Sequence, residues 1–475
     1  MDQQSLVELR NEPACAHNRG KHKGCAQPHP GATQGGCFFD GARNALMPIV
    51  DVAHLVHGPI SCAGSSWDAR GSLTSGSRLY RQGFTTDLSD LDIIMGQGEK
   101  RLLFSIQKII KEYHPAAVFI YMTCIPALHG DDVAAVARAA MQRWQVPVIT
   151  VDCAGFYGSK NLGNRLAGEV LVKQVIGTRE PEPPCWTPPG VSRVHDIGII
   201  GEWNVGGEFW RFLPLLDELG LRVLSTISGD SRFAEIQTMH RAEANLLICS
   251  KALLNVAREM QARYGIPYVE GSYYGMKPTS TALRALAKAI DDPDLQKRTE
   301  RLIRREERQL NRDLAPYKTM LTGKRVLIFS GGFKSWSLVS AMQELGLTVV
   351  ATGTEKSTDQ DKLRITTLMG DNAITIADND QQALISAFRH YKADIMIAGD
   401  RYIYSSLKSR IPFLDVDHIR HIAYSGYDGM RELAYQLSRA LSNPVWHWVD
   451  TPAPWENQLS RSRRQPPATG IPLIA

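Results

Sequence analysis

The sequence lacks any long hydrophobic run. None of its apolar stretches approaches the ~18 residues that a membrane-spanning helix requires. The opening residues, MDQQSLVELRNEP, have neither the basic region nor the apolar region of a secretory signal peptide. We therefore expect a cytoplasmic protein without a membrane partner.

Motifs that define several common enzyme classes are also missing. The chain has no GxxxxGK(S/T) phosphate loop and no strand-bound GxGxxG followed by an acidic residue ~20 positions later. It has no GxSxG nucleophile turn, no HExxH and no CxxC pair. The histidines are scattered, which is more typical of structural roles than of a zinc site. These absences argue against a nucleotide-binding fold, a serine hydrolase and a zinc enzyme.

A large excess of charge of one sign is absent as well. Lys and Arg number 54 against 49 Asp and Glu, which gives a net charge of +5. Basic residues are spread along the chain, apart from short clusters at 301–308 and 461–464. Nucleic-acid-binding domains usually present a denser basic face with interleaved aromatic residues. We expect no nucleic-acid partner.

What the chain does contain is a repeated alternation of short apolar strands and amphipathic helices, typical of parallel α/β layers. Its 475 residues suggest two to four domains. For example, the apolar spacing predicts a helix from Gly98 to Pro115, followed by a buried strand at 116–123. The Pro-rich segment REPEPPCWTPPG marks a domain boundary, and a charged helix is expected at 294–315. The predicted organisation is an irregular N-terminal arm at 1–45, α/β domains at 46–190, 191–320 and 321–450, and a disordered tail at 451–475.

Three of the eight cysteines lie where backbone can approach a ligand closely. Cys37 and Cys62 occupy Gly-containing turns, and Cys124 follows the predicted strand at 116–123. Iron–sulfur clusters are held by thiolates, which can come from separate loops of a rigid fold. Three thiolates are one short of the four that a cubane needs, which suggests a site completed by another chain. The alternative is that each cysteine is a small buried hydrophobic residue.

Two further stretches place polar groups at strand ends. Cys249 ends the predicted strand NLLIC and opens a helix, at the edge where ligands of open α/β sheets collect. The turn SGGFKSW offers a helix N-terminus beside Lys334, which suits an anion. An ordinary strand–helix turn explains the second pattern equally well.

Nine segments in order along the chain resemble the nitrogenase component 1 superfamily. They are GATQGGCFFDGA, DVAHLVHGPISCAGSSWDARG, DIIMGQGEKRL, YMTCIPALHGDD, GFYGSKNLGNRLAGE, HRAEANLLICSKALLNVAR, YGIPYVEGSYYG, FSGGFKSWS and YSGYDGM. The resemblance covers nearly the whole chain and is closest to the subunits that serve as scaffolds for assembly of the iron–molybdenum cofactor. It implies three Rossmann-like parallel-sheet α/β domains.

The resemblance also implies two cluster sites. Cysteines in the positions of Cys37, Cys62 and Cys124 hold a 4Fe–4S cluster whose fourth thiolate comes from a homologous N subunit, in an α2β2-type heterotetramer. Cys249 matches the cysteine that anchors the cofactor in the catalytic subunit. Here it would anchor a precursor, an iron–sulfur–carbide cluster that later receives molybdenum and homocitrate. Arg70 and Lys334 match basic residues that surround this anionic group.

Two departures from the catalytic pattern separate a scaffold from an enzyme. Ser425 stands where the catalytic subunit has a second anchoring His, and Asn164 stands where it has a His near the substrate. Because a neutral hydroxyl is a poor iron ligand beside imidazole, release of the cofactor should be easier here. The resemblance thus implies a non-enzymatic scaffold that works with the nitrogenase iron protein and a precursor-delivering assembly protein.

Two other interpretations remain open on sequence alone. One is a catalytic α-type subunit of a nitrogenase-like reductase, including a protochlorophyllide reductase of the same superfamily. The other is a cluster-free structural assembly partner. The sequence does not separate a molybdenum system from a vanadium or iron-only one, and it assigns no role to Cys15 or Cys25.

Overall fold

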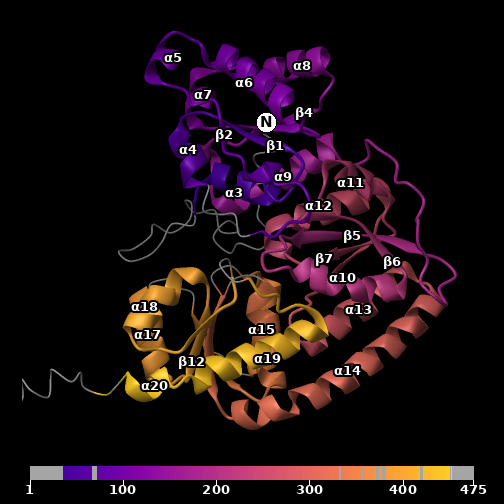
Figure 1. Ribbon diagram of the computed structural model, residues 1–475, viewed down its shortest axis with the longest axis vertical. Coiled ribbons are helices and arrows are strands. Elements are labelled where there is room, and N and C mark those ends of the chain that lie inside the picture. The colour runs from indigo at the N-terminus through magenta and orange to yellow at the C-terminus, as the bar shows by residue number, and fades with distance from the viewer. Residues whose placement is uncertain are drawn as a thin grey trace, which may run out of the picture.

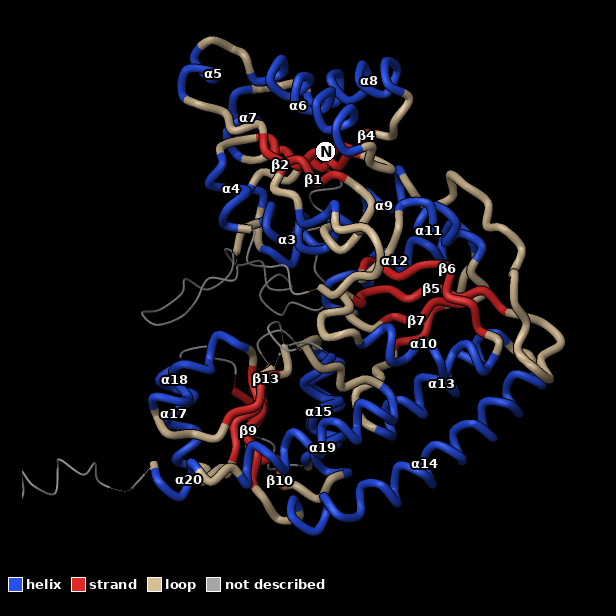
Figure 2. The backbone as a smooth tube through the Cα atoms, in the orientation of Figure 1, coloured by secondary structure: helices blue, strands red, loops and turns tan. Residues whose placement is uncertain are grey.

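The computed structural model describes residues 36–66, 72–330, 333–354, 357–370, 374–376, 381–417, 421–449 and 451 (Figure 1). Arg70, Cys15, Cys25 and all but the first residue of the predicted tail lie outside the described residues. Within the described part of the chain, the strands form three parallel sheets, which appear as three separate red layers in Figure 2. The α/β prediction is therefore confirmed.

The first sheet has the strand order β2-β1-β3-β4 and carries helices on both faces. Register pairs His57 at the end of β1 with Met122 at the end of β3, and Met122 with Asp152 at the end of β4. The carboxyl ends of these strands therefore share one edge, and the loops that carry Cys62, Cys124 and Cys153 all leave from it. The elements are α3 (Phe38–Leu46), β1 (Ala53–His57), α4 (Ile60–Ser65), η2 (Leu79–Arg81), β2 (Phe84–Thr85), α5 (Asp90–Ile94), α6 (Gly98–Tyr113), β3 (Val118–Met122), α7 (Cys124–His129), α8 (Val133–Trp144), β4 (Val148–Asp152), η3 (Gly155–Tyr157) and α9 (Lys160–Gln174).

The second sheet has the order β6-β5-β7-β8. The strand predicted at NLLIC is β7, a central strand of this sheet, and Cys249 follows its carboxyl end. The elements are β5 (His195–Glu202), α10 (Glu208–Leu219), β6 (Leu221–Ser228), α11 (Phe233–Thr238), η4 (Met239–Arg241), β7 (Ala244–Leu247), α12 (Ser250–Tyr264), β8 (Tyr268–Glu270) and α13 (Met276–Ile290).

The third sheet has the order β11-β10-β9-β12-β13. The long charged helix α14 (Pro293–Leu321) leads to it and runs along the outside of the second and third units (Figure 1). The remaining elements are β9 (Arg325–Phe329), α15 (Phe333–Glu344), β10 (Thr348–Gly353), α16 (Asp359–Met369), β11 (Thr375–Ile376), α17 (Gln381–His390), β12 (Ile395–Ala398), η5 (Asp400–Tyr402), α18 (Ile403–Lys408), β13 (Phe413–Asp415), α19 (Gly426–Ser442) and α20 (Val445–Trp448).

The predicted irregular arm is wrong for its last residues. Phe38–Leu46 is the helix α3, which buries Phe38 and Leu46 against α9. A Cβ atom on Gly41 would lie 1.8 Å from the carbonyl oxygen of Lys160, so the two backbones touch there. The sequence hid this helix because its apolar face depends on a partner far along the chain.

Two hydrophobic cores cross the predicted boundaries. One core joins residues of the first unit, such as Phe119, with residues of the second, such as Leu253. The other joins Phe212 of the second unit with Val326 and Leu433 of the third. The three sheets therefore rest on shared apolar interfaces. Among the described helices, none is both long enough and apolar enough to cross a membrane.

Candidate functional site

Two sulfur atoms converge on Gly155 at the carboxyl edge of the first sheet. Cys37 is the N-cap of α3, and Cys124 opens α7. A Cβ atom placed on Gly155 would lie 3.2 Å from Cys37 Sγ and 3.1 Å from Cys124 Sγ. The Gly155 N–H donates to Cys124 Sγ over 3.1 Å. Only a residue without a side chain leaves this space between the two sulfurs.

Cys62 belongs to the same group of thiols. It lies half-buried in α4. Burial raises the pKa of its thiol, a hydrogen bond with Thr123 lowers it, and the negative charges of Cys124, Cys37 and Asp40 raise it again. Cys62 therefore shares one electrostatic environment with Cys37 and Cys124. The structure brings together the three cysteines that the sequence singled out.

Cys153 is a neighbour of these thiols, since all three act electrostatically on it, but it belongs to the core. Its side chain is fully buried, and its Sγ is 3.6 Å from the carbonyl oxygen of Met122. Burial raises the pKa of this thiol well above its usual value. Such a cysteine behaves as a small core residue.

A buried polar network supports the loops that carry Cys62 and Cys124. His57 bonds through Nδ1 to Thr86 Oγ1 (3.1 Å) and through Nε2 to Asp131 Oδ2 (3.0 Å). The other carboxylate oxygen of Asp131 bonds to His129 Nδ1 at 2.7 Å. Burial lowers the pKa of His57, although the hydrogen bond to Asp131 opposes this effect. The sequence did not identify this network, because its members lie on separate strands and loops.

An arginine plays a similar role for the other side of the Cys62 helix. The fully buried Arg43 donates through Nη1 to the carbonyl oxygen of Ala63 (2.9 Å) and to Ser66 Oγ. These acceptors lie in the last turn and at the C-cap of α4, where backbone carbonyls lack partners within the helix. Arg43 thereby fixes the C-terminal end of α4, the helix that contains Cys62.

The thiol group suits a cluster better than a single ion. Among the residues that the structure describes, no three His, Cys, Asp or Glu side chains are placed to hold one metal ion together. Thiolates of an iron–sulfur cluster bind different irons, so they need not meet at one point. Two thiols beside Gly155, with the third thiol in the same electrostatic environment, are a donor set that fits such a group.

Several large apolar side chains that lie close to the thiols in sequence are exposed. Ile60 precedes Cys62 by two residues and is 60% exposed, Leu128 lies on the helix opened by Cys124 and is 76% exposed, and Phe156 follows Gly155 and is 55% exposed. Leu91, Ile94 and Met95 at α5 are also exposed. Exposed apolar patches of this kind mark interaction surfaces.

Cys249 follows the central strand β7 and packs against the hydrophobic core shared by the first and second units. It is the N-cap of α12, and Gly201 approaches it so closely that a Cβ atom there would lie 2.9 Å from Cys249 Cβ. Burial raises the pKa of the Cys249 thiol to about 11, and Asp361 adds to this effect. The N–H groups of Ala252 and Lys251 and the charge of Lys334 oppose it. A nearby metal would therefore be needed to make it a thiolate near neutral pH.

Lys334 and Ser425 meet at Tyr274. The ammonium group of Lys334 lies 5.6 Å from the Tyr274 ring centroid and donates to Val416 O (3.0 Å) and Asp417 Oδ1 (3.3 Å). Ser425, which is fully buried, pairs through its backbone with Tyr274 and donates its hydroxyl to the Glu208 carbonyl oxygen at 2.7 Å. The hydroxyl is therefore already used within the protein.

Asn164 lies on α9, the helix that packs against α12. Arg165 Nη2 is 3.4 Å from the carbonyl oxygen of Lys251, and Asn255 donates to the carbonyl oxygen of Arg165 at 2.8 Å. The Asn164 Oδ1 atom is buried and has no hydrogen-bond partner among the described residues. These contacts connect its helix with the helix of Cys249, but they do not show Asn164 in contact with Cys249 itself.

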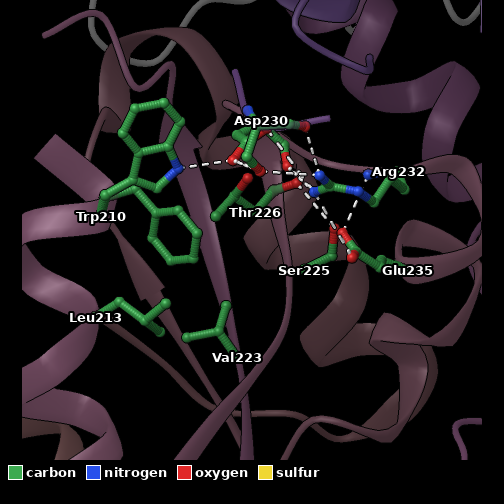
Figure 3. A pocket seen from close by; sticks show the side chains of 10 residues that line it. Trp210, Leu213, Val223, Ser225, Thr226, Asp230, Arg232 and Glu235 are labelled. Atoms are coloured by element: carbon green, nitrogen blue, oxygen red, sulfur yellow. Dashed lines mark hydrogen bonds and ion pairs between the residues drawn. The ribbon is translucent and has the colours of Figure 1, made fainter. Parts of the chain in front are cut away.

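A pocket of about 460 Å³ lies elsewhere, beside the edge strand β6 (Figure 3). Trp210 reaches across it and donates from Nε1 to Asp230 Oδ2 at 2.6 Å. Asp230 and Arg232 also form hydrogen bonds with Ser75. These bonds connect the loop between α4 and η2 of the first unit to the second unit. No cysteine lines this pocket, so it offers no thiolate for an iron–sulfur cluster. The lining residues are Ser75, Phe209, Trp210, Leu213, Val223, Ser225, Thr226, Asp230, Arg232 and Glu235.

The sequence of this chain also matches a known protein family. Residues 37–442 match the model of the nitrogenase component 1 type oxidoreductases. The chain belongs to this family. A solved structure titled "Nitrogenase Cp1 at pH 5" superposes with a TM-score of 0.80 at 25% identity, over 95% of this chain and 99% of that one.

Among its relatives are proteins named for one particular task. The nitrogenase iron-molybdenum cofactor biosynthesis protein NifE of Klebsiella pneumoniae is 56% identical over 95% of this chain and 99% of its own length. NifE of Nostoc sp. is 51% identical over 96% of this chain and 95% of its own length. NifE of Rhodobacter capsulatus is 45% identical over 96% of each chain.

Proposed function

We propose that this chain is a scaffold subunit on which the iron–molybdenum cofactor of nitrogenase is completed. Its relatives named NifE are cofactor biosynthesis proteins, and the similarity extends over nearly the whole length of the chains. In this role it holds a precursor while molybdenum and homocitrate are added, and then passes the product on. The nitrogenase iron protein and a precursor-delivering assembly protein are its proposed partners in these steps.

The observation that carries the proposal is the convergence of Cys37 and Cys124 on Gly155, with Cys62 beside them. We assign these three thiols as ligands of a 4Fe–4S cluster, which would supply electron-transfer chemistry when bound. A homologous N subunit provides the fourth thiolate in an α2β2-type heterotetramer. The exposed apolar side chains around the thiols support a partner at this surface.

The precursor is the cargo of the second site. Cys249 is its proposed anchor, because the cysteine lies at a helix N-terminus beside Lys334. Lys334 and Arg70 would offset the negative charge of the cargo. Asn164 and Ser425 complete the proposed surroundings. Because the Ser425 hydroxyl donates to the Glu208 carbonyl oxygen, it supports a site with one firm protein anchor rather than two.

A single anchor favours transfer of the cluster over catalysis on it. We therefore propose that the chain acts as a scaffold and not as an enzyme, in contrast to a catalytic α-type subunit. The described cysteines are all free thiols, which suits a reducing compartment such as the cytoplasm.

The test is metal analysis of the chain purified with its partner subunit under strict anoxia. Replacement of Cys37, Cys62 or Cys124 by Ala should remove iron and the visible absorption of the shared cluster. Cys153→Ala serves as the matched control, because that thiol lies in the core beside the site. Unchanged iron and absorption in all three variants would exclude the proposed ligands.

A further inference from the structure

The cations near Cys249 are already paired with carboxylates of this chain. Lys334 lies 3.3 Å from Asp417, and Arg364 lies 3.5 Å from Asp361 and 3.4 Å from Glu270. Lys334 and Asp361 both act electrostatically on the Cys249 thiol. Glu270 ends β8, and its register partner on β7 is Leu247, two residues before Cys249. The ion pairs therefore border the site that holds the proposed cargo.

The Asp417 carboxylate packs closely against Gly399. A Cβ atom on Gly399 would lie 2.5 Å from Asp417 Oδ2, so a larger residue at 399 would displace the carboxylate. The Asp417 N–H donates to Asp415 Oδ1 at 2.9 Å, which fixes the backbone just after β13. Lys334 meets it from the first turn of α15, with a side chain only 13% exposed. The pair is thus a defined contact at the edge of the third sheet.

Arg364 forms a similar ion pair, which joins the third unit to the second. It comes from α16 of the third unit, stacks over Trp336 at 5.0 Å, and reaches Glu270 of the second unit. Its side chain and that of Glu270 are 29% and 22% exposed. A partly exposed ion pair of this kind is weak enough to be exchanged for another partner.

We propose that Asp417 and Glu270 compete with the cargo for Lys334 and Arg364, and thereby set how readily the cargo leaves. An anionic cluster attracts the two cations, but Lys334 must leave Asp417, and Arg364 must leave Glu270, to turn to the cluster. When the cluster departs, the carboxylates pair with the cations again, so no unpaired charge remains beside Cys249. This inference rests on the proposed function, and it assigns a regulatory role to residues around the same site.

The experiment measures cargo retention in the purified complex with its partner subunit, loaded with the iron–sulfur precursor under anoxia. Iron that stays bound is followed during a chase with excess cofactor-free nitrogenase component 1. Asp417→Asn keeps the side-chain shape and removes the charge, so Lys334 is freed for the cargo. We expect roughly tenfold slower loss, the order of one charge-assisted contact. Glu270→Gln should slow loss in the same direction, through Arg364.

A control and a double variant make the result decisive. Asp394→Asn removes one charge at the opposite end of the third sheet, where the carboxylate accepts from the Arg325 N–H, and should leave retention unchanged. Lys334→Gln should speed loss, and adding Asp417→Asn to it should have no further effect, because Asp417 acts through Lys334. Equal retention in wild type, Asp417→Asn and Glu270→Gln overturns the competition, as does a full Asp417→Asn effect without Lys334. Failure of the wild-type complex to hold any precursor overturns the proposed function itself.

Discussion

Gly155 is the residue on which the geometry of the three thiols depends. Its backbone φ is not in the left-handed region, so the need for glycine is steric rather than conformational. Two sulfur atoms would lie within 3.2 Å of any added Cβ atom. Its N–H group also donates to one of them. A glycine that acts through its small size and its backbone N–H gives little signal in a sequence.

Gly155→Ala should weaken iron binding without unfolding the chain. Overpacking of this kind costs about 1–3 kcal/mol, and we expect the cost to appear as reduced retention of iron. The measurement is iron per complex after anoxic gel filtration. Gly64→Ala is the matched control, because a Cβ atom there meets no heavy atom within 4 Å although it lies two residues from Cys62. Equal iron in both variants would contradict the role of Gly155.

Cys249 should react slowly with alkylating reagents near neutral pH. Burial raises the pKa of its thiol to about 11, so the reactive thiolate is scarce below that pH. Its alkylation rate in the cluster-free chain should rise about tenfold per pH unit until the pH approaches 11. Peptide mapping by mass spectrometry measures this, with the exposed Cys185 as an internal reference. A pH-independent rate for Cys249 would contradict the burial of the thiol.

At the scale of elements, the start of α14 depends on a carboxylate with two tasks. Asp292 caps the helix by accepting from the Asp294 N–H at 2.8 Å. Its other oxygen lies 2.9 Å from Nε2 of the buried His195, whose Nδ1 bonds to Glu243. One residue thus joins the long helix to the first strand of the second sheet.

Asp292→Ala should lower the free energy of unfolding by about 1–2 kcal/mol, as loss of an N-cap usually does. Hydrogen bonding to His195 lowers the pKa of Asp292 below its usual 3.8. Its contribution is therefore fully present above about pH 4 and is lost as the pH falls through the lower, folded-state pKa. Denaturant unfolding of wild type and variant between pH 3 and 7 measures both effects. A difference between the two proteins that grows toward low pH would contradict this sign.

Elements were predictable where their signal is local. The helix α6 and the strand β3 follow from apolar spacing within a single stretch, and Cys124 was placed correctly at the end of that strand. The helix α3 was missed, because the residues of α9 against which Phe38 packs lie more than a hundred positions later in the sequence. The same reason hid the supports of the thiol site. Thr123, Arg43 and the His57–Asp131 pair act through contacts distant in sequence, and no short pattern announces them.

For the whole molecule, shared cores make the three units dependent on one another. The connector at 179–190 carries no regular secondary structure, yet apolar side chains on both of its sides form one cluster. Proteolytic sites in such connectors are usually accessible. A boundary in the sequence is therefore not a boundary in the core.

A protease site inserted at Pro188–Gly190 should therefore be cut without separating the fragments. We expect the nicked chain to elute from gel filtration as one species, because the first core joins Phe119 with Leu253 and Met260. Leu253→Ala, which should cost about 2–5 kcal/mol, would weaken this association. Gel filtration and denaturing electrophoresis of the same sample measure it. Fragments that separate without denaturant would contradict the shared core.

The glycines between α3, α9 and α12 have a consequence for the path between the two sites. Gly163 brings α9 against the Phe38 backbone, and Gly168 brings it against Val256 of α12. Cys37 caps the first of these helices and Cys249 caps the last. If both thiols hold redox groups as proposed, the tunnelling distance for electrons is set by how closely these glycines allow the helices to pack. Drift in surface side chains would leave that distance unchanged, whereas one added methyl group along this stack would alter it.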